Sequence, residues 1–153
     1  AYKWEFGGSI YRDKIGPSDG IVGNYNEEID TARLIYTGER PEFLAEAANI
    51  QHTRIGMPGV WNSQAGYVQL AYRLSWLESK WKPYVRYEYI HVPTSDPVFN
   101  PPGNPVPSLS GWLGGVRYDF SAFAALKLEY RVSQRVSNQP DIQGLFVQTA
   151  LVF

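Results

Sequence analysis

The chain has 153 residues, of which 15% are aromatic and 19% are charged, and its formal net charge is −1. This charge argues against a nucleic-acid partner, and the absence of cysteine excludes disulfides and thiolate metal sites. A membrane-spanning helix needs about 20 apolar residues in a row, and the apolar stretches here are far shorter. The length allows one core, so we expect a single domain over residues 1–153.

Alternation with a period of two residues, together with turn residues, predicts eight β-strands and no convincing helix. The expected strands lie near residues 2–12, 28–37, 41–51, 65–76, 81–92, 111–120, 122–134 and 144–153. Long connections at 13–27, 52–64, 93–110 and 135–143 alternate with short ones at 37–40, at 77–80 and around Ser121. This alternation is typical of outer-membrane β-barrels, whose long loops face outward and whose tight turns face the periplasm. On this pattern both termini lie in the periplasm.

The last expected strand is apolar, alternates and ends on Phe153. Outer-membrane barrels close on such strands, and we interpret residues of the same parity as Phe153 as facing lipid. Aromatic residues of that face gather at the periplasmic strand ends and form a predicted girdle of Tyr2, Trp4, Tyr36, Phe43, Trp76, Trp81, Phe120 and Phe153. Tyr89, Trp112 and Tyr130 form a thinner set near the opposite ends.

A soluble barrel is the structural alternative, because it turns the same apolar face inward. The girdle argues against it, since a soluble core has no reason to collect aromatic rings at the ends of its strands. Strand three is the weak element: its lipid parity carries small and polar residues, ending in Asn49 and Gln51. We expect that strand to end early, the alternative being a surface that packs against another barrel or subunit.

The opposite face carries charges of both signs. Its predicted lumen-lining charge ladder consists of Arg73, Lys82, Arg86, Glu88, Arg117, Asp119, Lys127, Glu129 and Arg131. In hydrocarbon, each Lys or Arg would cost about 2–4 kcal/mol near the midplane. We interpret the set mainly as salt bridges that rigidify the wall. The alternative is an excess of positive charge that favours anions in a pore.

The segments Ala65–Leu74, Trp81–Tyr89, Gly115–Phe120 and Ala125–Tyr130, with the terminal strand, resemble the C-terminal part of Gram-negative outer-membrane porins. The resemblance is to the phosphate-selective porin type and covers about residues 65–153. It implies a larger and often trimeric barrel of roughly 16 to 18 strands that passes small solutes through a water-filled pore. It also implies that the barrel-assembly machinery reads the C-terminal strand. The competing architecture is a complete eight-stranded barrel, in which side chains fill the interior.

We expect no enzymatic activity, no cofactor and no metal site. His91 and His52 lack the sequence context of a lipid A deacylase, and we interpret them as polar residues at the outer strand ends near lipopolysaccharide. The sequence therefore predicts an all-β, porin-like transmembrane barrel for passive diffusion of small hydrophilic solutes across the bacterial outer membrane, with anions as one option. The alternatives are a structural or adhesive barrel that acts through its extracellular loops, and an outer-membrane lipid-modifying enzyme.

Overall fold

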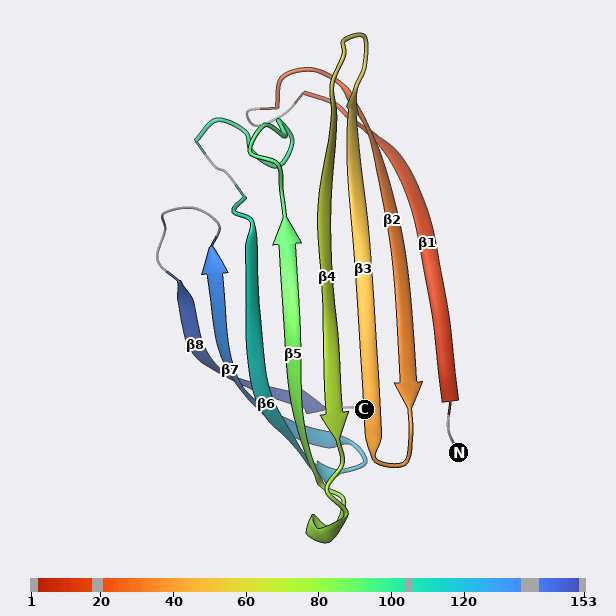
Figure 1. The fold of residues 1–153 in the computed structure, drawn as a ribbon, viewed down its shortest axis with the longest axis vertical. Coiled ribbons are helices and arrows are strands. Elements are labelled where there is room, and N and C mark those ends of the chain that lie inside the picture. Colours follow the sequence, from red (N-terminus) through yellow and green to blue (C-terminus); the bar gives the residue numbers. More distant parts are fainter. Residues whose placement is uncertain (1–2, 18–20, 104–105, 136–140, 152–153) are drawn as a thin grey trace.

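The computed structural model describes residues 1–153 except 1–2, 18–20, 104–105, 136–140 and 152–153. Its eight strands are β1 (Lys3–Ile15), β2 (Tyr25–Thr37), β3 (Pro41–Arg54), β4 (Val60–Tyr72), β5 (Trp81–His91), β6 (Leu109–Ser121), β7 (Ala124–Arg135) and β8 (Ile142–Leu151). They form one antiparallel sheet in chain order, as Figure 1 shows. The all-β, antiparallel prediction is confirmed.

The strands are longer than expected at one end of the sheet. β3 continues to Arg54 and β4 begins at Val60, so the predicted long connection 52–64 shrinks to residues 55–59. The expectation that strand three ends early is therefore wrong. Backbone hydrogen bonds do not depend on side-chain polarity, and Gln51 Nε2 donates to Asn62 Oδ1 of the neighbouring strand at 3.0 Å.

At the other end, β4 stops at Tyr72, four residues before the expected end at 76. A short 3-10 helix, Ser75–Leu77, follows, and Glu78 and Ser79 adopt positive φ angles of 53° and 57° to turn the chain into β5. We call this end of the sheet, with connections 38–40, 73–80 and 122–123, the turn end. The opposite end, with connections 16–24, 55–59, 92–108 and 136–141, is the loop end.

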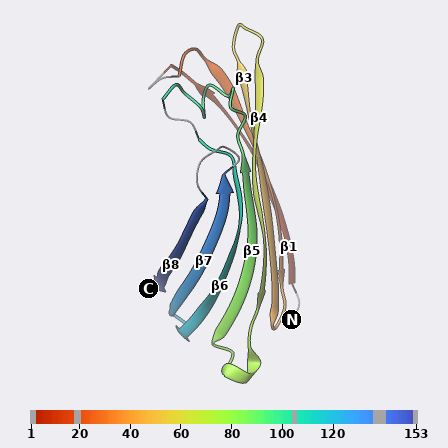
Figure 2. The ribbon, with the colours of Figure 1, turned by 60° about the vertical axis from the view of Figure 1, so that its left-hand side comes forward.

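The sheet is open. β1 and β8 lie at opposite edges in both Figure 1 and Figure 2, and no pairing between them occurs in the described part of the chain. Closure into a barrel thus stays a prediction. Among the described residues, no helix is long and apolar enough to cross a membrane.

The sheet is curled, and the curl distinguishes its two faces. Lys82 of β5 pairs with Glu42 of β3, and Arg131 of β7 pairs with Glu88 of β5, each across an intervening strand. Strands two apart in a flat sheet are separated by about 10 Å, so these contacts draw the side chains together on a concave face. The buried strand residues all belong to that face: Tyr25, His52, Ser63, Gln69, Ala71, Tyr84, Leu113, Ala125 and Ser133. We call it the inner face, and the other one the outer face.

Candidate functional site: the charged inner face and its loop

The outer face carries the residues that parity assigned to lipid, and they are exposed. Phe6 is 78% exposed, Trp112 60% and Leu145 66%. Val68, Leu70, Val85, Tyr87, Leu128, Tyr130, Val147 and Leu151 are exposed on the same face. The soluble alternative expects this apolar set on the inside of a closed barrel, whereas in the described open sheet the set lies on the outer face. A continuous exposed apolar surface of this extent marks contact with a membrane or a partner.

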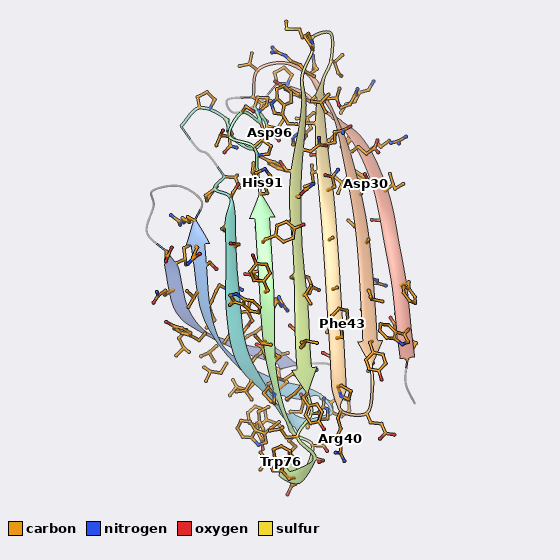
Figure 3. The ribbon with its side chains drawn as sticks, in the orientation of Figure 1. Asp30, Arg40, Phe43, Trp76, His91 and Asp96 are labelled. Carbon is orange, nitrogen blue, oxygen red and sulfur yellow. The ribbon has the colours of Figure 1, made fainter. Side chains whose placement is uncertain are left out.

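The aromatic residues of the outer face lie mainly near the turn end. Phe43 and Trp76 lie there in Figure 3, together with Trp4, Tyr36, Trp81 and Phe120. Ring centroids of Trp4 and Tyr36 are 4.7 Å apart. Trp76 lies in the 3-10 turn rather than on β4 and is 72% exposed. Tyr2 and Phe153 lie outside the described residues.

The apolar surface has a sharp limit toward the loop end. Ala32, Ala47, Gly66 and Tyr89 form one row of register partners, and two residues farther along each strand the next row is Asp30, Asn49, Gln64 and His91. Asp30 and His91 both lie in the upper part of the sheet in Figure 3. The predicted position of His91, at a polar strand end, is therefore confirmed.

The inner face holds the predicted charge ladder, and most of its members pair. Lys82 Nζ lies 3.0 Å from Glu42 Oε2, Arg131 Nη1 lies 3.0 Å from Glu88 Oε1, and Lys127 Nζ lies 3.2 Å from Glu129 Oε2. Asp119 forms ion pairs with two arginines: Arg73 Nη1 lies 2.8 Å from Asp119 Oδ2, and Arg117 Nε lies 2.6 Å from Asp119 Oδ1. These pairs make the wall a network of compensated charges.

Arg86 is the exception within this set. Its Nε and Nη2 donate to Oε1 of the neutral Gln69 at 3.0 and 2.7 Å, and its guanidinium lies over the Tyr67 ring, 4.6 Å from the centroid. The predicted charge ladder has more basic than acidic members, and this excess is reduced because Glu42, on β3, joins the network. Sequence spacing did not assign Glu42 to Lys82, since β4 separates their strands.

A second polar cluster fastens the connection between β5 and β6 to the inner face. His52 and Asp96 are both fully buried, and His52 Nδ1 lies 2.8 Å from Asp96 Oδ2. The other ring nitrogen, Nε2, lies 3.0 Å from Glu27 Oε2, and Ser63 Oγ donates to Asp96 Oδ2 at 3.3 Å. We call these four residues the loop anchor.

The loop itself is ordered around Asp96. The amides of Val98 and Phe99 donate to Asp96 Oδ1 at 2.9 and 3.3 Å, and the Phe99 ring packs edge-on against His52 at 4.9 Å between centroids. At its base, Val92 N donates to Ser108 Oγ at 2.8 Å. The proline-rich segment thus folds onto the inner face near the loop end, where Figure 3 shows Asp96.

The sequence pattern indicated a strand end at His52 but gave no sign of the partners of its ring. Asp96 follows His52 by 44 residues, and only the fold joins them. The cluster does not resemble a catalytic triad, because Ser63 Oγ bonds to Asp96 and not to the His52 ring. Among the described residues, no group of three or more His, Asp or Glu side chains is arranged to hold a metal ion.

One pair of pKa shifts falls in the turn between β4 and β5. Lys80 Nζ donates to Glu78 Oε2 at 2.6 Å, which lowers the pKa of the Glu78 carboxyl and raises the pKa of the Lys80 ammonium. Both side chains are exposed, so this contact organises the turn without a large effect on stability.

Comparison of the chain with protein-family models, with curated proteins and with solved structures finds no match. The porin resemblance therefore stays an expectation from the sequence.

Proposed function

We propose that the chain forms part of the wall of an outer-membrane β-barrel that lets small hydrophilic solutes diffuse passively through a charged lumen. The observation that carries this proposal is the slant of the apolar surface across the sheet. Successive register partners put Trp4 of β1 level with Leu145 of β8, through Tyr36, Phe43, Leu70, Val85, Gly114 and Tyr130.

Relative to this row of register partners, the apolar residues of β1 and those of β8, the two edge strands, lie on opposite sides. On β1 the apolar stretch runs toward the loop end, from Trp4 to Ile10, whereas on β8 it runs toward the turn end, from Leu145 to Leu151. Toward the loop end, the apolar stretch stops at Ile10 on β1 and at Leu145 on β8, so this limit of the surface shifts by six residues between the two edges. Six residues span about 20 Å along a strand and seven strand spacings about 34 Å, which corresponds to an inclination of about 30°.

This inclination approaches the tilt of about 35–45° that strands adopt in membrane barrels. When the strands tilt by that amount, the slanted surface becomes a horizontal band parallel to a bilayer. A soluble sheet needs no such relation between its apolar limits and its strand direction. The aromatic residues at the turn end then lie at one membrane interface, as the girdle requires.

The charged inner face supplies the aqueous side of the wall. The ion pairs of Lys82 with Glu42 and of Arg131 with Glu88 run along the wall and not across an interior, which suits a lumen wider than that of an eight-stranded barrel. The open edges of β1 and β8 are consistent with such a larger barrel. The proposed setting is the bacterial outer membrane, with lipopolysaccharide at the loop end, the periplasm at the turn end, and assembly into trimers as in the porins that the chain resembles.

A second candidate function is a structural or adhesive barrel that acts through its loops. The observation in its favour is that the connection between β5 and β6 is tied down at two described points, by the loop anchor at Asp96 and by the hydrogen bond between Val92 and Ser108. The loop packs against the inner face, however, and a loop in that position narrows a pore more directly than it meets a partner.

Reconstitution into planar bilayers tests the proposal. We expect steady, ohmic current steps from the folded protein, and larger steps from a variant with the loop freed by Asp96→Ala. A silent bilayer, with the protein inserted as judged by protease protection, would contradict a pore and favour the structural candidate.

A further inference from the structure

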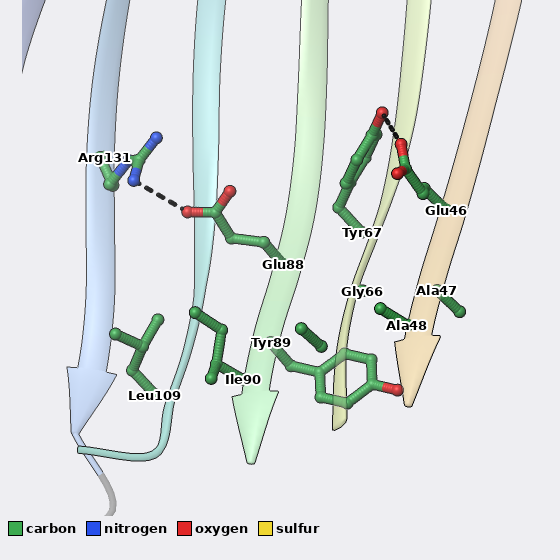
Figure 4. A pocket seen from close by; sticks show the side chains of 11 residues that line it. Glu46, Ala47, Ala48, Gly66, Tyr67, Glu88, Tyr89, Ile90, Leu109 and Arg131 are labelled. Atoms are coloured by element: carbon green, nitrogen blue, oxygen red, sulfur yellow. Dashed lines mark hydrogen bonds and ion pairs between the residues drawn. The ribbon is translucent and has the colours of Figure 1, made fainter. Parts of the chain in front are cut away.

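The inner face carries an apolar hollow between the charge pairs and the loop anchor. It is a shallow hollow, open to solvent, with a volume of about 330 Å³, which is within the size range of small-molecule sites. Figure 4 shows the side chains that line it, among them Glu46 and Tyr67 on one side, Glu88 and Arg131 on the other, and Ala48, Ile90 and Leu109 farther along the strands. Ala47, Gly66 and Tyr89, which belong to the outer-face row, also border it.

The floor of the hollow is a single row of register partners. Ala48 of β3, Ala65 of β4, Ile90 of β5 and Leu109 of β6 lie side by side. Two residues toward the loop end, Ser63 of β4 belongs to the loop anchor. The floor thus lies next to the point where the 92–108 loop is fastened, on the way from the loop end to the charge pairs.

Exposed large apolar side chains are few on the inner face, and those on its described strands, besides Ile90 of the floor, are Tyr11 of β1 and Phe146 of β8. The outer face accounts for most of the exposed apolar residues, yet Ile90 points to the charged inner face and remains 39% exposed. Apolar side chains that are exposed to water within a polar wall contribute to binding when a ligand covers them, because their apolar surface is then removed from water.

The polar rim decides which kind of ligand fits. Tyr67 Oη donates to Glu46 Oε2 at 3.1 Å, and Arg131 Nη1 donates to Glu88 Oε1 at 3.0 Å. The rim therefore presents carboxylate oxygens, a phenol and a guanidinium. Each of these groups already has a hydrogen-bond or ion-pair partner within the rim. An ionic solute of either sign meets a like charge as well as an opposite one, whereas hydroxyl groups can both donate to the carboxylates and accept from the guanidinium.

We propose that this hollow binds a neutral polyhydroxylated solute of monosaccharide size. The C–H face of the solute packs on Ala65, Ile90 and their neighbours, and its hydroxyls exchange hydrogen bonds with Glu88, Arg131 and Glu46. The inference rests on the proposed function, because it names the solute class for that lumen. The excess of basic residues in the predicted charge ladder suggested a preference for anions. The present proposal is instead a preference for uncharged solutes.

The test measures block of the ion current through the reconstituted protein by D-glucose, with urea at the same concentration as a control for hydrogen bonding without an apolar face. We expect glucose to reduce the current in a saturable way and urea to leave it unchanged. Ala65→Leu fills the hollow and should raise the half-blocking concentration of glucose at least tenfold. Glu88→Gln with Arg131→Gln removes two rim charges together and should weaken the block while the current persists.

Thr31→Leu is the matched control, because Thr31 lies in the same inner-face row on β2, beside Ala48 but outside the hollow. It places the same leucine side chain next to the hollow, loses only the exposed hydrogen bond between the Thr31 and Ser9 hydroxyls, and should leave the glucose block unaltered. Current that glucose does not reduce, or that benzoate or a primary amine blocks at lower concentration than glucose does, would overturn the assignment.

If no current appears at all, the pore proposal fails and the hollow is tested separately. Equilibrium dialysis of labelled glucose against the folded protein in detergent micelles then gives the answer. Saturable uptake that Ala65→Leu abolishes and Thr31→Leu preserves supports the site, and uptake equal in all three proteins refutes it.

Discussion

Tyr84 of β5 lies across Gly115, its register partner on β6, and so reaches β7. A Cβ atom at position 115 would come within 2.5 Å of Tyr84 Oη and 2.6 Å of Cζ. With no side chain there, the ring passes over β6 and lies 5.0 Å from Lys127 Nζ. Gly115 is thus a point where the wall of the inner face depends on the absence of a side chain.

Gly115→Ala should therefore displace the Tyr84 ring and destabilise the folded sheet by about 1–3 kcal/mol, the usual range for overpacking. Urea unfolding of the protein in detergent or vesicles measures the change. Gly114→Ala is the control, because a Cβ atom at that neighbouring position meets nothing within 4 Å. Equal stability of the two variants would show that Tyr84 and the Leu128 carbonyl oxygen, which lies 2.7 Å from the position of that Cβ atom, both move aside freely.

Asp96→Ala should release the 92–108 loop. The substitution leaves the buried His52 ring and the amides of Val98 and Phe99 without their acceptor, and unsatisfied buried groups cost about 1–3 kcal/mol each. Limited proteolysis should cut the loop at least tenfold faster than in the parent protein. Asp141→Ala, at an exposed position before β8, should leave the cutting rate unchanged. Unaltered protection of the loop in Asp96→Ala would mean that other contacts hold it.

Glu42→Gln should shift the pore toward anions. It removes the carboxylate that compensates Lys82, whose ammonium lies 3.0 Å from Glu42 Oε2, and leaves a positive charge on the inner face. The reversal potential in a potassium chloride gradient should move toward that of chloride. Lys82→Gln should move it the opposite way, and Glu39→Gln, in the turn between β2 and β3, should not move it. If neither Glu42→Gln nor Lys82→Gln changes the reversal potential, the pair lies away from the conduction path.

Val147→Arg should impair insertion into phospholipid vesicles by about 2–4 kcal/mol, because it puts a charge in the middle of the proposed lipid-facing band. Gln143→Arg provides a matched comparison on the same face of β8, four residues away and beyond the limit of the apolar surface. It removes only the exposed hydrogen bond that Gln143 Oε1 accepts from Tyr130 Oη at 3.2 Å, so it should be nearly neutral. Folding into vesicles, followed by denaturant titration, measures both variants, and an equal effect would argue against a bilayer around this face.

Strand number and face assignment followed from local pattern, whereas strand length did not. Asn49 and Gln51 suggested that strand three ends, because polar side chains are typical of strand limits. The backbone there pairs regardless, with Asn49 opposite Gln64 and Gln51 opposite Asn62. The polar side chains of Asn49 and Gln51 mark where the apolar surface of the outer face ends. They do not mark where the strand ends.

The sequence alone determined which side chains share a face, because successive residues of an extended chain point to opposite sides by covalent geometry. For this reason Val147 and Leu145 could be separated from Arg131 and Glu88 without a structure. Which inner-face groups meet was decided by register and curl. Lys82 selects Glu42 across β4, and Asp96 reaches His52 from a loop 44 residues away, because a curled sheet joins segments whose separation along the chain carries no signal of contact.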